Sequence, residues 1–234
     1  MPFSSDLFAD NDALEPSRTP HIPVSERYSV GGYEVLSGRS GNFSCHTVLS
    51  GEVWKMGTEE KLALSGAVRE VLHMYIGKAE TVLAAGIGNR YIAADCLGPL
   101  VCKKLVTGIA LLYAASPGTP AQTGLDTAET VSLLAKSIGA ELIITVDSLC
   151  ATDITRLGTA VQINNVGLIP GSALAHTSGE INAKTMPCPV VSLGVPTVFY
   201  YEERLLAPAD VDVITECYST VLASAINGVI FSRK

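Results

Sequence analysis

The sequence lacks the features of several common classes of protein. It has no cluster of Lys and Arg, no basic run exceeds two residues, as at Lys103-Lys104, and its formal net charge is -7. Binding to nucleic-acid phosphates requires clustered positive charge, so we expect no nucleic-acid partner. No stretch is continuously apolar over the length of a membrane span, and the N-terminus has no basic segment followed by an apolar one. We therefore expect no membrane span, no secretory signal and a cytoplasmic location.

Cysteine pairs and histidine clusters are also missing. The six cysteines are scattered without a C-x-x-C pair, and no histidine stands at metal-ligand spacing. This pattern is typical of reduced, buried cysteines in a cytoplasmic protein. We predict neither a metal site nor a cofactor.

The composition and length indicate one substantial globular domain. The chain has 234 residues, of which 47% are hydrophobic and 17% charged, enough to bury a full core. Residues 1–27 are rich in Pro, Ser and Asp without periodicity and read as a flexible or propeptide-like leader. Residues 28–234 are predicted to form a single α/β domain.

The pattern along the chain changes after an N-terminal meander of short strands at 27–54 and a helix that begins at Thr58 and stops at Gly77. From there, apolar strands alternate with amphipathic helices. Strands that are apolar on both faces predict an α/β fold, a mainly parallel twisted sheet with helices on both faces. Expected strands are 81–88, 108–115, 140–147, 161–166, 188–195 and 197–201, and expected helices are 95–107, 127–139 and 209–230.

Two acidic residues follow expected strands. In such a sheet, function gathers beyond the carboxyl ends of the strands, which is where Asp95 and Asp147 fall. A convergent pair of carboxyl groups would divide into one ionised group and one protonated group, as general acid/base hydrolysis requires. The alternative is that each aspartate caps a helix, which is the commoner role for an acid at a strand-to-helix junction.

Two other kinds of site fit the sequence poorly. The segment GIGNRY has Gly86 and Gly88 but Tyr91 where a dinucleotide fingerprint requires glycine, so these glycines are predicted to allow close backbone approach in the crevice. Ser172 and His176 stand four residues apart, but no orienting acid completes a serine triad.

Four stretches taken together resemble the germination protease family of spore-forming bacteria. They are GIGNRYIAADCLGPLV (86–101), SPGTPAQTGLDTAE (116–129), ITVDSLCATDITRLGTAVQINNVGLIPGSALAH (144–176) and PVVSLGVPTVF (189–199), in the family's order. The resemblance implies a fold similar to hydrogenase maturation proteases and an aspartic-type endopeptidase that degrades small acid-soluble spore proteins. It implies Asp95 and Asp147 as the catalytic pair, with no metal.

The resemblance also implies a homo-oligomer made as a zymogen and located in the spore core. The expected substrate crevice combines the matching segments with the glycine and Ser/His positions noted above. Its predicted residues are Gly86, Gly88, Asn89, Gly124, Ser172, His176 and a turn containing Gly194, Pro196 and Thr197.

The chain also departs from the family pattern. It is shorter than the typical member, and Cys150-Ala151-Thr152 stands where the family tends to have an arginine. Two alternatives therefore stay open: a non-catalytic peptide-binding or regulatory paralogue in sporulation, and a metal-dependent maturation-type peptidase using Asp95, Asp147 and His176.

Overall fold

The computed structural model describes residues 22–171, 179–202 and 204–232. The strands are β1 (Glu26–Val30), β2 (Tyr33–Ser40), β3 (Phe43–Leu49), β4 (Val82–Gly86), β5 (Leu112–Ala115), β6 (Leu142–Ala151), β7 (Ala160–Asn164), β8 (Val190–Tyr201) and β9 (Arg204–Leu206). The α-helices are α1 (Thr58–Ile76), α2 (Leu97–Lys104), α3 (Pro120–Thr123), α4 (Thr127–Ile138) and α5 (Val211–Phe231). Short 3-10 helices are η2 (Val53–Lys55), η3 (Ala93–Asp95) and η4 (Ile154–Arg156).

The strands form one mixed sheet in the order β1-β2-β3-β7-β8-β6-β4-β5, with β9 paired to β8. The pairs that link β5, β4, β6 and β8 are parallel. The meander β1-β2-β3 joins through β7, and all of its pairs are antiparallel. The predicted α/β sheet is confirmed, and its parallel pairs fall in the half that carries Asp95 and Asp147.

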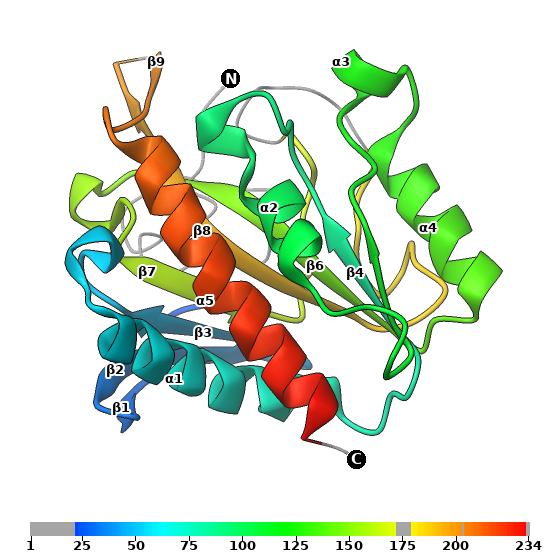
Figure 1. The fold of residues 1–234 in the computed structure, drawn as a ribbon, viewed down its shortest axis with the longest axis horizontal. Helices are drawn as coiled ribbons and strands as arrows, with labels where there is room; N and C mark the ends of the chain where they lie inside the picture. The colour runs from blue at the N-terminus through cyan, green and yellow to red at the C-terminus, as the bar shows by residue number, and fades with distance from the viewer. Residues whose placement is uncertain (1–21, 172–178, 203, 233–234) are drawn as a thin grey trace.

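Helices cover both faces of the sheet (Figure 1), as the two-sided apolar strands predict. Along β6, Ile144 and Val146 enter the larger core cluster, which α1, α2 and α5 complete. Ile143 enters the smaller cluster on the other face, where α4 contributes Val131. Successive strand residues point to opposite faces, so each central strand needs apolar side chains throughout.

Helix α5 is the one helix in the described part of the chain with the length and mean hydropathy of a membrane span. Of its most apolar window, 61% is buried. Tyr218 and Ile226 lie in the core, where α5 packs against α1 and α2. The helix therefore has the burial expected of the central helix of a globular domain.

Several predicted boundaries on the parallel strands are wrong. The strand expected to begin at 108 begins at Leu112 as β5. The strand expected to end at Asp147 continues to Ala151 as β6. The turn expected at Gly194, Pro196 and Thr197 is instead part of one continuous strand, β8. A register shift opposite Leu149 and Cys150 leaves Thr197 without a register partner in β6, and proline is tolerated in a strand at such an irregularity.

The predicted leader, residues 1–27, lies mostly outside the described residues. Its last residues are described: Ile22 is buried against Cys45 and Val166, and β1 begins at Glu26. The division of the chain at residue 28 stays a prediction.

Candidate active site

Asp95 lies at the end of η3, on the segment that connects β4 to α2. Its Oδ2 accepts a hydrogen bond from the backbone N–H of Asn89 at 2.8 Å. Gly88, at φ 111°, makes this closure possible, because a Cβ there would lie 2.1 Å from the backbone oxygen of Asp95. Cys96, not Asp95, holds the N-cap position of α2. The helix-cap interpretation of Asp95 is therefore wrong.

The surroundings of Asp95 favour its protonated form. Burial raises the pKa of this carboxyl group from 3.8 to about 6, and the N–H of Asn89 opposes the rise. Removing a carboxylate from water disfavours its charge, whereas a hydrogen bond to the charged form favours it. A carboxyl group with this pKa can hold and release a proton near neutral pH.

Asp147 lies inside β6, where 9% of the residue is exposed. Its register partner in β8 is Gly194, and its Oδ1 accepts a hydrogen bond from the N–H of Ser148 at 2.8 Å. Because β6 continues for four residues beyond Asp147, no helix begins there. The cap interpretation is wrong for Asp147 too.

Glycines bring α2 close to the end of β4 and to the middle of β6. A Cβ on Gly98 would lie 2.4 Å from the backbone oxygens of both Ile87 and Val146, and a Cβ on Gly86 would lie 2.3 Å from the oxygen of Gly98. Gly86 and Val146 are register partners. The next residue after Val146 is Asp147, so this contact sets the start of α2 beside the strand position that carries the second acid.

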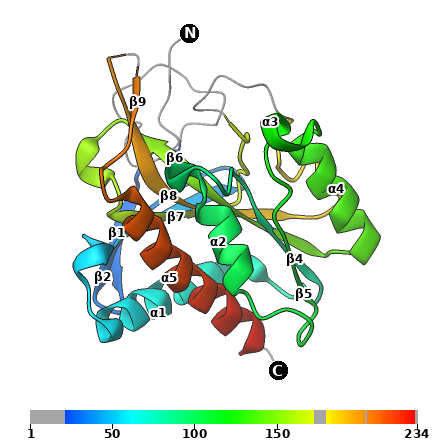
Figure 2. The ribbon, with the colours of Figure 1, turned by 45° about the horizontal axis from the view of Figure 1, so that its top comes forward.

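Thr197, at the register shift in β8, binds the segment that carries Asp95. Thr197 is fully buried, and its hydroxyl donates a hydrogen bond of 2.6 Å to the backbone oxygen of Ala94. Through this contact and others, η3 packs against β6, β8 and α5. Figure 2 shows this edge of the sheet, where the β4–α2 segment and α3 lie at the same end of the parallel strands. The segment that carries Asp95 therefore packs beside β6, the strand that carries Asp147.

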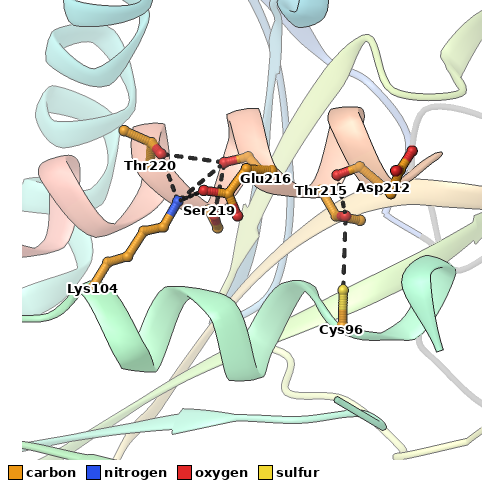
Figure 3. A network of polar contacts seen from close by, with 7 residues as sticks. All are labelled: Cys96, Lys104, Asp212, Thr215, Glu216, Ser219 and Thr220. Carbon is orange, nitrogen blue, oxygen red and sulfur yellow. Dashed lines mark hydrogen bonds and ion pairs between the residues drawn. The ribbon is translucent and has the colours of Figure 1, made fainter. Parts of the chain in front are cut away.

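Polar contacts fasten α2 to α5 (Figure 3). At the start of α2, the Cys96 thiol lies 3.8 Å from the Thr215 hydroxyl. At its end, Lys104 Nζ lies 2.5 Å from the Glu216 carboxylate and 2.7 Å from the Thr220 hydroxyl. Since Cys96 follows Asp95 directly, these contacts limit movement of the helix next to the acid.

The predicted crevice residues divide into four kinds of position. Gly86 and Gly88 allow close backbone approach, and Asn89 contacts Asp95. Gly124 ends α3 in the left-handed conformation, with no atom near its Cβ position. Within β8, Gly194 packs on the Leu149 side chain, Thr197 binds Ala94, and Pro196 is buried between them. The remaining two, Ser172 and His176, lie outside the described residues.

Two contributors were missed by the sequence interpretation. Gly98 fits α2 to the sheet, and the Gln122 side chain contacts Asn89. The Gly98-Pro99 pair in the first turn of α2 is a weak sequence signal for the role of Gly98. Nothing in the sequence around Gln122 indicates its contact with Asn89. Asp126 has a structural role, because its side chain caps α4 by accepting from the N–H of Glu129.

Among residues 22–171, 179–202 and 204–232, no group of three or more His, Cys, Asp or Glu side chains is arranged to hold a metal ion. The third ligand of the metal-dependent alternative, His176, lies outside these ranges.

Fold and site together define an α/β protein with one acid after the parallel strand β4 and a second inside the neighbouring strand β6. The family model described as germination protease matches residues 55–202, so the chain belongs to the germination protease family.

The relatives and solved structures that it matches are as follows. It is 32% identical over 178 residues to a germination protease of Clostridium acetobutylicum and 33% identical over 203 residues to one of Clostridium tetani. These matches cover 68% and 79% of this chain but 54% and 62% of the relatives. Among solved structures, the hydrogenase maturation protease HycI of Thermococcus kodakarensis matches 67% of this chain and 98% of that chain, with TM-score 0.46 and 17% identity. HybD of E. coli matches 65% of this chain and 93% of that chain, with TM-score 0.40 and 15% identity.

Proposed function

We propose that the chain is an aspartic-type endopeptidase in which Asp95 and Asp147 form the catalytic pair. Membership of the germination protease family supports the class of reaction. The observation that carries the assignment is the raised pKa of Asp95, at about 6, on the edge of the sheet that also holds Asp147. Two carboxyl groups that differ in proton affinity are what acid/base hydrolysis requires.

In the proposed mechanism, Asp95 begins protonated and Asp147 begins as a carboxylate. Asp147 accepts a proton from water as the water oxygen attacks the carbonyl carbon of the scissile amide. Asp95 then donates its proton to the amide nitrogen, the C–N bond breaks, and an acid and an amine leave. The pair finishes with the proton on Asp147, and exchange with solvent returns it to Asp95.

We propose small acid-soluble spore proteins as substrates, because the four family-like segments imply them. The same resemblance supports a cytoplasmic location in the spore core and assembly as a homo-oligomer from a zymogen. The non-catalytic alternative rests on Cys150-Ala151-Thr152, which stands where the family tends to have an arginine.

The test compares Asp95→Asn and Asp147→Asn with the unchanged protein on a purified small acid-soluble spore protein. Each substitution removes a proton carrier and keeps the side-chain size, so cleavage should fall roughly 100- to 10,000-fold. Asp126→Asn is the matched control, since Asn also caps helices and should leave cleavage unchanged.

Cleavage at the unchanged rate in either catalytic variant would overturn the proposal. Binding of the spore protein without turnover by the unchanged chain would select the peptide-binding alternative. Loss of cleavage with a chelator, restored by a divalent metal, would select the metal-dependent one.

A further inference from the structure

A chain of two hydrogen bonds connects α3 to the Asp95 carboxyl group. Gln122 on α3 donates from Nε2 to Oδ1 of Asn89 at 2.7 Å. The backbone N–H of Asn89 donates to Oδ2 of Asp95 at 2.8 Å. Because α3 follows β5 and Asp95 follows β4, this contact joins the segments beyond two neighbouring strands.

Other hydrogen bonds fix the orientation of both side-chain amides. Oε1 of Gln122 accepts from the N–H of Thr119 at 3.1 Å, which leaves the NH₂ group of Gln122 directed at Asn89. Oδ1 of Asn89 accepts from both Gln122 and the N–H of Tyr91, the latter at 3.0 Å. A carbonyl oxygen has two acceptor positions, so both are used here.

Hydrogen bonds add to burial in holding the Asn89 turn. Gly88, on one side of Asn89, is buried, but Arg90, Tyr91 and Ile92, on the other side, are all exposed. The N–H of Ile92 donates to the backbone oxygen of Asn89 at 3.1 Å, and the Asn89 side chain accepts the two hydrogen bonds described above. The side-chain hydrogen bonds are therefore one of the restraints on the backbone N–H that contacts Asp95.

We propose that Gln122 is a positioning residue for Asp95: by holding the Asn89 side chain, it keeps the Asn89 N–H on the Asp95 carboxyl group. The catalytic meaning of this role rests on the proposed function. Gln122 acts through Asn89, and its loss should free the turn and weaken the hydrogen bond to Oδ2.

Weakening this bond has a defined electrostatic result. The Asn89 N–H favours the ionised carboxylate, so its departure raises the pKa of Asp95 further. The other ionisable groups on elements packed against η3 are not changed by substitution at position 122. They are Cys96, Cys102, Lys103 and Lys104 around α2, Asp212, Glu216, Cys217 and Tyr218 on α5, Asp147 and Cys150 on β6, and Tyr200 and Tyr201 on β8.

Three variants of the full chain distinguish the proposed role of Gln122 in positioning Asp95 from a general effect on the stability of α3. Gln122→Met removes the donor without adding charge. Gln122→Glu keeps an oxygen for the Thr119 N–H but loses the donor to Asn89. Thr119→Ala is the control for the start of α3, because it removes the 3.4 Å contact of the Thr119 hydroxyl with Oε1 of Gln122 and keeps both the backbone donor to that oxygen and the bond from Gln122 to Asn89.

The readout is the pKa of the Asp95 carboxyl group from a carbon-13 NMR titration, with the signal assigned through Asp95→Asn. We expect a rise of about 0.5 unit in Gln122→Met, or about threefold in proton affinity, because one hydrogen bond to the carboxylate is weakened. Gln122→Glu should show a larger rise, because it adds a negative charge, and Thr119→Ala should show none. In cleavage assays, the decline of kcat/KM at high pH should move upward by the same amount.

An unchanged Asp95 pKa in Gln122→Met, or an equal rise in Thr119→Ala, would overturn the positioning role. The titration does not depend on turnover. If Asp95→Asn cleaves normally, the proposed function fails while the titration still decides the role of Gln122.

Discussion

The parallel and antiparallel halves of the sheet each bury an ionisable group, with different results. In the antiparallel half, Nδ1 of His46 on β3 lies 2.5 Å from the hydroxyl of Tyr75 on α1, and this hydroxyl also donates to the Ile163 oxygen. In the parallel half, Asp95 receives a backbone N–H at the end of a connecting segment. His46 therefore lies between a helix and the sheet, whereas Asp95 lies on the segment that follows β4.

The same physical cause acts on both groups. Burial lowers the pKa of His46, assisted by Arg39, and burial raises the pKa of Asp95 to about 6. In both cases the neutral form is favoured, because a low-dielectric surrounding disfavours charge. The difference in role comes from position: carboxyl ends of parallel strands present side chains to a crevice, and a contact between a helix and strands does not.

The largest expected effect is on the close contact between α2 and the parallel strands β4 and β6. In Gly98→Ala, the new Cβ would lie 2.4 Å from two backbone oxygens, so α2 must move away from the sheet. We expect the free energy of unfolding to fall by roughly 3 kcal/mol or more, and cleavage to be lost with it. Urea denaturation measures the first effect and a peptide assay the second.

The matched control is the same substitution in the other half. Gly66 lies inside α1 with no atom within 4 Å of its Cβ position. Alanine favours a helix over glycine, so Gly66→Ala should stabilise the protein by about 1 kcal/mol. Equal effects of the two substitutions would show that the close contact at Gly98 does not set the position of α2.

The next effect is the change in stability on replacing Asp95, which is expected at high pH and absent at low pH. Since its folded-state pKa of about 6 exceeds the ordinary 3.8, this group contributes stability below pH 3.8 that is lost as pH rises through 6. Asp95→Asn cannot ionise, so it should be more stable than the unchanged protein at pH 8 and show no such gain at pH 3.8. The gain should be about 1 to 3 kcal/mol, at about 1.4 kcal/mol per pKa unit.

Urea denaturation at the two pH values measures this difference, with Asp126→Asn as the control for loss of a carboxylate elsewhere. A gain in stability that is the same at both pH values would show that burial does not raise the pKa of Asp95.

The sequence predicts the fold class because two-sided apolar strands leave few other arrangements. It also predicts that Asp95 and Asp147 share an edge, since both follow apolar runs in parallel strands. The ends of the strands are harder to predict from the sequence. Asp147 interrupts an apolar run, but pairing with β8 extends β6 to Ala151. Pro196 suggested a turn, but it lies beyond the register partners of β7, where its missing N–H costs no ladder bond on that side.

Contacts that depend on the packing of distant segments were not predictable. Thr197 binds the oxygen of Ala94 across 103 residues of chain, and Gln122 binds Asn89 across 33. Neither side chain differs in local pattern from a surface residue. Their partners follow from the strand order, which brings β8 beside β6 and β5 beside β4.

The smallest effect tests the antiparallel half. Tyr75→Phe removes the hydroxyl that contacts both His46 and the Ile163 oxygen, leaving two polar atoms without that partner. We expect a loss of about 1 to 2 kcal/mol in the free energy of unfolding. Cleavage by the folded variant should be unchanged, because this contact lies on the half of the sheet away from the two acids. Urea denaturation and cleavage below the unfolding transition measure the two quantities. A fall in cleavage with an unchanged free energy of unfolding would mean that the contact between Tyr75 and His46 also supports the active site. The proposed division of roles between the two halves of the sheet would then be wrong.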